Sequence, residues 1–125
     1  MADWEFGTTG FRDPEEVRRR NVNGLEGSGL AGAARHYLAA RGHACGEVFP
    51  EDFGWVFEAT SPEGRYLCAF TIETGEDGER VGHASVTKWR SALDRVLGRN
   101  RQFRDEAVPR AVEAFLRGHP DLREA

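Results

Sequence analysis

Cysteine is scarce in this 125-residue chain, where only Cys45 and Cys68 are present. Two cysteines cannot build a disulfide framework or a four-cysteine zinc site, and a chain of this length buries a core without covalent cross-links. The four histidines form no metal-binding motif with cysteine or with one another. We therefore expect two reduced thiols, no metal site and no cofactor.

Long apolar runs are also missing. No segment reaches the roughly 18 residues that a membrane-spanning helix needs, and Asp3 and Glu5 occupy the region where a signal peptide carries cations. We expect a cytoplasmic protein that does not contact a membrane. The sequence shows no catalytic dyad, triad or phosphate-binding loop, so an enzyme is not the expected class.

The residues that are present favour a folded domain. Hydrophobic residues make up 39% of the chain and include eight Phe, three Trp and two Tyr, which is more apolar material than a disordered chain carries. The length fits a single domain over residues 1–125. We expect residues 28–118 to form its core. We expect residues 1–27 to begin as a short edge strand or a mobile arm, followed by a short helix after Asp13.

Alternating apolar residues predict strands in the middle of the chain. Phe53–Thr60, Arg65–Glu73 and Arg80–Val86 have this period of two, and Ser61–Gly64 and Gly75–Glu79 have the composition of turns. Turns this short join antiparallel neighbours, whereas parallel strands need a long crossover. The three segments therefore predict a meander and exclude a parallel α/β arrangement for the central strands.

Helical spacing of apolar residues occurs in three segments. Ser28–Arg41 and Asp105–Arg117 each place apolar residues three and four positions apart, and Gly42 and Gly118 follow as stop signals. The segment Lys88–Leu97 fits a helix, but Ser85–Thr87 also favours a continued strand. The predicted fold is an α+β two-layer sandwich, with a three- to four-stranded antiparallel meander sheet packed against two or three helices.

Charge is unevenly distributed although the net charge is only −4. Residues 44–80 contain nine acidic residues and two arginines, a local balance of −7. Residues 88–104 contain six basic residues and one aspartate, a local balance of +5. Solvated faces that partly neutralise each other would explain this distribution, and so would two surfaces that attract charged partners.

The segment Phe49–Trp55 is the most distinctive, because two acids lie between a proline and a glycine with large aromatic residues on either side. As structure, it is a turn that leads into a strand, with Phe53, Trp55 and Phe57 together on the core face. As a site, it places acids where they can hold a basic group of a partner. The candidate partner-binding residues are Glu51, Asp52, Trp55 and Glu58.

The run Pro50-Glu51-Asp52-Phe53-Gly54-Trp55 resembles the start of a strand in small bacterial α+β proteins of the immunity-protein kind. The resemblance implies a protein partner, such as a basic toxin or effector, and no catalytic role. We therefore expect a non-enzymatic binding module of immunity or inhibitor type that uses an acidic surface.

The alternative expectation is a nucleic-acid-binding module. In it, the basic segment follows phosphate groups while Trp89 or Phe103 stacks on a base. The same aromatic residues would otherwise lie in the core above a solvated helix face. The candidate residues for this alternative are Lys88, Trp89, Arg90, Arg95, Arg99, Arg101 and Arg104.

Overall fold

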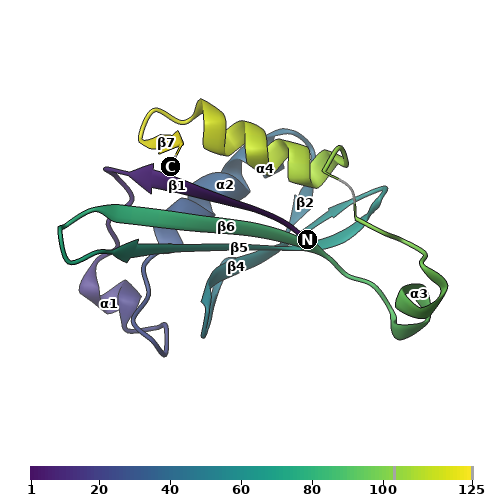
Figure 1. Cartoon of the computed structure of the whole chain (residues 1–125), viewed down its shortest axis with the longest axis horizontal. Helices are drawn as coiled ribbons and strands as arrows, with labels where there is room; N and C mark the ends of the chain where they lie inside the picture. The colour runs from purple at the N-terminus through teal and green to yellow at the C-terminus, as the bar shows by residue number, and fades with distance from the viewer. Residues whose placement is uncertain (103, 125) are drawn as a thin grey trace.

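A computed structural model describes residues 1–102 and 104–124 and shows a seven-stranded antiparallel sheet with two of its helices packed on one face (Figure 1). The hydrogen-bonded order of the strands is β2-β4-β5-β6-β1-β7, and β3 also pairs with β4. The strands are β1 (Ala2–Thr8), β2 (Ala44–Cys45), β3 (Phe49–Glu51), β4 (Gly54–Ser61), β5 (Gly64–Thr74), β6 (Arg80–Lys88) and β7 (Leu122–Glu124). The helices are α1 (Glu15–Arg18), α2 (Ser28–Ala40), α3 (Ala92–Leu97) and α4 (Ala107–Gly118).

The predicted meander forms the centre of the sheet. The pair Ser61 and Gly64 closes the β4–β5 hairpin, and the pair Thr74 and Arg80 closes the β5–β6 hairpin. Alternation sends Trp55 and Phe57 of β4 into the core. Phe53 does not share that face, because it lies in the tight β3–β4 turn before the strand begins.

The expected strand number, three or four, was too small. The four further strands are short or lie near the ends of the chain. β3 forms a tight hairpin with β4, whereas β1, β2 and β7 pair with strands that are more distant in sequence. β1 pairs with β6 on one side and with β7 on the other, so it is an interior strand and not a mobile arm or an edge. Its residues Ala2 and Phe6 are buried as a result. Local patterning carries little information about such distant pairing.

The described residues contain four helices, which are the short one expected after Asp13 and one in each of the three segments with helical spacing. Helices α2 and α4 pack on one face of the sheet and on each other (Figure 1). α1 has a single turn. The predicted helix over Lys88–Leu97 was too long, because β6 continues to Lys88 and α3 begins only after the cap residue Ser91.

The start of α2 is capped by a residue from outside the helix. The carboxylate of Asp13 accepts hydrogen bonds from the backbone amides of Gly27, Ser28 and Gly29 at 2.8, 2.9 and 3.0 Å. These amides have no acceptor within the helix, and their partial positive charge favours a carboxylate. Asp13 therefore links the segment before α1 to the helix that covers the sheet.

The core lies between the sheet and the two packed helices. Its largest fully buried side chains are aromatic, and they come from β4 and β5, with aliphatic side chains from α2 and α4 above them. Phe57 and Phe70 stack with ring centroids 5.9 Å apart. Within the described part of the chain, no helix has the length and apolar character needed to cross a membrane.

A buried ion pair between Arg80 and Glu26 joins the first third of the chain to β6. Arg80 also donates hydrogen bonds to the carbonyls of Gly10 and Phe11, and Glu26 accepts one from the amide of Asp13. The side chains of Arg80 and Glu26 are only 2% and 10% exposed. Because a buried charge needs both a partner and hydrogen bonds, this network fixes residues 10–26 against the sheet.

Candidate protein-binding surface

The sheet has one face that α2 and α4 do not cover, which we call the open face. On each of the central strands, the residues that alternate with the core positions lie here. One row across the sheet follows directly from the strand register. It runs through Phe49, Val56, Ala69, Ser85 and Asp3.

Acidic side chains predominate among the charged groups of the open face. Asp3 and Glu5 project from β1, Glu58 from β4 and Glu73 from β5, and all four are exposed. Arg65 is the cation nearest to Glu58, at 3.5 Å between Nη2 and Oε1. Both side chains are more than half exposed, so this pair contributes little stability and leaves the face negative.

Two phenylalanines remain exposed beside these acids. Phe49 of β3 is 39% exposed, and Phe53 at the β3–β4 turn is 53% exposed. Phe53 borders a shallow groove of about 240 Å³. The groove floor includes the small side chains of Ala69, Thr71 and Ser85, and its far rim includes Asp3 and Glu5. The open face therefore combines an aromatic edge, a floor of small residues and an acidic rim.

The β3–β4 turn is held firmly against the body of the protein. The side-chain amide of Asn21, which is buried, donates to the carbonyls of Glu51 and Gly54, and Asn23 donates to the carbonyl of Asp52. Gly54 has a φ of 156°, and a Cβ there would lie 2.6 Å from the carbonyl oxygen of Phe70. Only glycine allows so close an approach of the two backbones. The turn is therefore preorganised.

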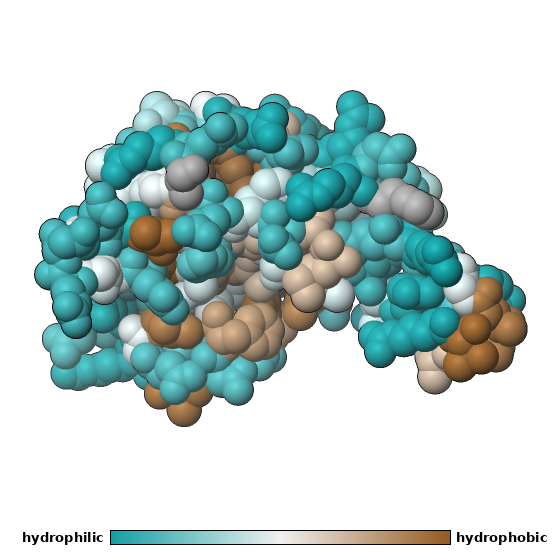
Figure 2. Space-filling model, in the orientation of Figure 1, coloured by the Kyte–Doolittle hydropathy of each residue, from teal (hydrophilic) through white to brown (hydrophobic). Residues whose placement is uncertain are grey.

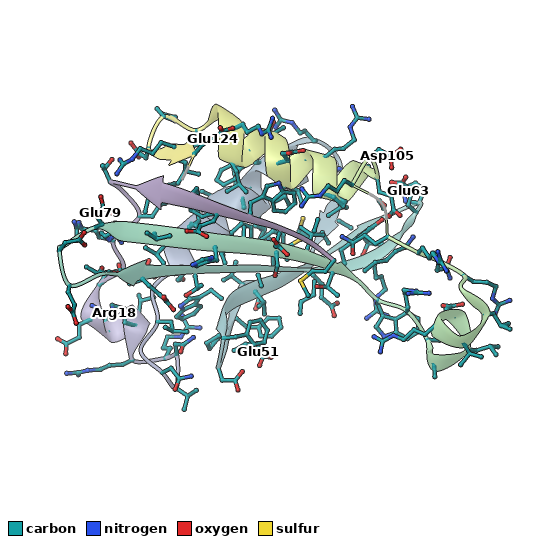
Figure 3. The ribbon with its side chains drawn as sticks, in the orientation of Figure 1. Arg18, Glu51, Glu63, Glu79, Asp105 and Glu124 are labelled. Carbon is teal, nitrogen blue, oxygen red and sulfur yellow. The ribbon has the colours of Figure 1, made fainter. Side chains whose placement is uncertain are left out.

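The structure places the four predicted partner-binding residues in three different settings. Glu51 and Asp52 are exposed on the β3–β4 hairpin, where Figure 3 shows Glu51 at the lower end of the sheet. Glu58 is exposed on the open face. Trp55 is fully buried, and its Nε1 donates to the carbonyl of Leu25 at 2.8 Å. Trp55 as a direct contact was therefore wrong, because alternation with Phe57 puts it in the core.

Sequence reasoning missed the contribution of β1 and of the two phenylalanines. The alternation of Asp3 and Glu5 with Trp4 and Phe6 already indicated one acidic face. Only the pairing of β1 with β6 places that acidic face beside Phe53, because Asp3 and Glu5 lie opposite Ser85 and His83. The alternation in β1 was visible in the sequence, but the place of β1 in the sheet could not be predicted from it.

The basic segment is used partly for internal contacts. Lys88 is buried and pairs with Glu106 at 3.4 Å, which removes it from any external phosphate. Arg104 lies 5.4 Å from the ring centroid of Trp4 and donates to the carbonyl of Asp3. Arg90 donates to the carbonyls of Arg99 and Asp94. Three of the expected phosphate-binding residues therefore have structural partners.

The remaining candidates of the basic segment are exposed. Arg95, Arg99 and Arg101 lie on and just after α3, and Arg99 also pairs with Asp94 at 3.6 Å. Trp89 is 62% exposed, so its expected alternative place in the core was wrong. Phe103 lies outside the described residues.

A second buried polar cluster lies where β5 and β6 meet the start of α4. The hydroxyl of Tyr66 donates to the carboxylate of Glu106, which Lys88 also contacts. Burial and the bond to Glu106 raise the pKa of Tyr66 above its ordinary range. Glu63 accepts from the amide of Ala107 at 2.7 Å and so caps α4 nearby. The cluster therefore anchors α4 to the sheet.

Neither cysteine forms a disulfide, and both are free thiols. Cys45 is half-buried and Cys68 is buried. Burial raises the pKa of the Cys68 thiol, which disfavours the reactive thiolate. Among the described residues, no group of three His, Cys, Asp or Glu side chains is placed to hold a metal ion.

The fold and the open face define an α+β protein with a one-sided antiparallel sheet. Comparisons with protein-family models, with curated proteins and with solved structures each found no match.

Proposed function

We propose that this protein is a non-enzymatic binding module of immunity or inhibitor type. Its open face binds a protein partner whose contacting surface is basic. One observation carries the proposal. Phe49 and Phe53 are exposed on a sheet face whose charged side chains are mostly acidic. Large exposed aromatic side chains beside a groove are typical of protein contact sites.

The aromatic and acidic groups have separate roles in this proposal. Phe53 supplies apolar area that a partner buries at the centre of the contact, because its turn is rigid and loses little entropy on binding. The acids around it, including Glu51, Asp52 and Glu58, attract a basic partner and speed its association. Trp55 acts only by supporting the turn from the core.

The decisive experiment compares four immobilised forms of the protein exposed to extract of the native host. The wild type should retain a stoichiometric basic protein at low salt. It should release that protein at about 0.5 M NaCl, where the Debye length is about 4 Å. The variant Phe53→Asp should retain none, because it removes the apolar anchor while changing an exposed position.

The matched control is Glu76→Arg/Asp77→Arg, which reverses two exposed acids in the β5–β6 hairpin, outside the open face. It makes the same change in net charge as Glu51→Arg/Asp52→Arg. The control should still retain the basic partner protein, and Glu51→Arg/Asp52→Arg should not. Equal retention by all variants, or no stoichiometric partner at either salt concentration, would overturn the proposal.

A further inference from the structure

Residues 89–102 form a protrusion that extends beyond the end of the sheet. Figure 1 shows α3 apart from the other helices, and α3 has no extensive contact with any other helix or strand. Figure 2 shows an apolar cluster at its end, separated from the body by a notch. The apolar side chains are Leu93, Val96 and Leu97, which are 57%, 81% and 58% exposed.

These three side chains share one face of α3, because they are spaced at i, i+3 and i+4. This spacing is how an amphipathic helix presents anchors to a groove. The same spacing predicted a helix that packs on its own core. The structure retains the helix but leaves its apolar face without a partner among the described residues.

The protrusion is nevertheless built to hold a single conformation. Ser91 and Asp94 form a reciprocal capping box at the start of α3, and Gly98 ends it with a φ of 68°. Gln102 bonds to the amide of Lys88 and to the carbonyl of Val86, so the protrusion begins and ends at the same point of β6. Isolated helices this short are not stable in water, so these contacts preorganise a binding element.

The charge of the protrusion is opposite to that of the open face. Arg95, Arg99 and Arg101 are exposed around the apolar cluster. Asp3 and Glu5 form the rim of the groove on the open face, and Glu51 and Asp52 lie at the hairpin near its other side. An amphipathic helix with a basic surround is therefore complementary to an aromatic groove with an acidic rim.

The dimensions of the two surfaces also agree. A helix of six residues is about 9 Å long. The groove extends across β1, β6 and β5, which is two strand spacings or about 10 Å. The protrusion begins four residues after Ser85 of the groove floor, about 13 Å along the strand direction. In a pair of copies related by a two-fold axis, the protrusion of each copy can lie on the groove of the other.

We infer that the protein forms a symmetric dimer, in which Leu93, Val96 and Leu97 of each copy pack into the open-face groove beside Phe53 of the other. This inference goes beyond the proposed function, because it places a second copy of this chain on the same face, where that copy competes with any other protein partner. A single helix of this length covers too little surface for a stable complex. A reciprocal contact doubles the buried area.

Sedimentation velocity over a range of protein concentrations tests the inference. The wild type should be a dimer at low salt and should dissociate at about 0.5 M NaCl. The variant Val96→Glu changes a side chain that is 81% exposed, so its fold should be intact. We expect its dimer dissociation constant to rise about 30-fold or more. Ala39→Glu is the matched control, because Ala39 is exposed on α2, which covers the opposite face of the sheet.

Complementation identifies the partner surface. The variants Glu51→Arg/Asp52→Arg and Arg95→Glu/Arg101→Glu should each be monomeric alone, because each places like charges across the contact. When mixed, they should form a heterodimer that has one interface with both charges reversed. A monomeric wild type at high micromolar concentration, or a dimer unaffected by Val96→Glu, would overturn the inference.

The two proposals fail separately in these experiments. If the wild type is monomeric but the Phe53-dependent basic protein is still captured, the dimer is wrong and the binding module stands. If the dimer forms as described and no other protein is retained, the open face serves self-association alone. Binding of labelled single-stranded DNA or RNA that depends on Arg95 and Arg101 in a monomeric wild type would instead support the nucleic-acid alternative.

Discussion

Nη2 of Arg80 lies 3.1 Å from Oε2 of Glu26, and the two side chains form a buried pair across 54 positions of sequence. Removing one partner leaves the other charge buried and unpaired. We predict that Arg80→Met and Glu26→Gln each lower the free energy of unfolding by about 3 to 5 kcal/mol.

The double variant should lose clearly less than the sum of the two single losses, because the second substitution removes a charge that is already unpaired. Urea unfolding of the four proteins gives this coupling. Strict additivity would show that the pair does not act as a unit.

Trp55 and Phe53 are two positions apart but should respond oppositely to truncation. Trp55→Ala removes a fully buried side chain and its bond to Leu25, so we expect a loss of about 3 to 5 kcal/mol in unfolding free energy. Phe53→Ala changes an exposed side chain, so we expect its effect to stay within about 0.5 kcal/mol.

Thermal unfolding followed by circular dichroism measures both variants. A melt of Trp55→Ala that superimposes on that of the wild type would contradict the assignment of the core face.

Stability should decline at alkaline pH. Burial and the bond to Glu106 raise the pKa of Tyr66 in the folded state above its unfolded value of about 10. Above that pH the unfolded chain loses the tyrosine proton while the native state retains it, so the free energy of unfolding falls as pH rises.

Burial raises the pKa of Cys68 as well, which begins a similar decline above its unfolded value of about 8.5. Urea midpoints between neutral pH and about pH 11 should therefore fall. The slope above about pH 10 should be shallower in Tyr66→Phe. An unchanged slope would mean that Tyr66 ionises equally in both states.

The capping box of α3 should control the order of the protrusion without supporting the core. Hydrogen bonds from Asn100 and Ser91 lower the pKa of Asp94, so its carboxylate stays charged and its effect is lost only as pH falls through that lowered value. We predict that Asp94→Ala speeds amide hydrogen exchange in residues 92–97 and leaves the melting temperature of the domain nearly unchanged.

Asn100→Ala should have a smaller effect of the same kind, because it removes one of the bonds to Asp94. A large drop in melting temperature for Asp94→Ala would show that the protrusion is part of the cooperative core.

Sequence patterning predicts the elements whose periodicity and boundaries are local. The β4–β5–β6 meander has alternation and short turns, and α2 and α4 have amphipathic spacing with glycine stops, so each is recognisable without its partners. β2, β3 and β7 contain two or three residues each, too few for a period to be detected. They exist because a longer strand supplies their hydrogen bonds.

Asp13 illustrates the same limit for a single residue. Asp13-Pro14-Glu15-Glu16 is typical of a helix start, which predicted that Asp13 caps the helix directly after it. In the structure its carboxylate caps α2 at the more distant Gly27, Ser28 and Gly29. The chemistry of capping is local, but the choice of helix depends on how the chain folds back.

The candidate site was predictable only in part. Glu51 and Asp52 are exposed as expected, because turn residues with charged side chains stay in water. Helical periodicity could not distinguish the exposed apolar face of α3 from a buried one, since both have the same spacing. Whether such a face is covered depends on where β6 ends and on how residues 98–102 return to it.

The interior position of β1 determines the order in which the protein can fold during synthesis. β1 is synthesised before both of its partners, so it must wait for β6, whose paired residues begin at Val81, and for β7, which begins at Leu122. Until α4 is also available, the core face of the meander is covered by α2 alone. Nascent chains therefore pass through a long interval in which an unpaired edge and an apolar face are both open, the condition in which chaperones are most needed.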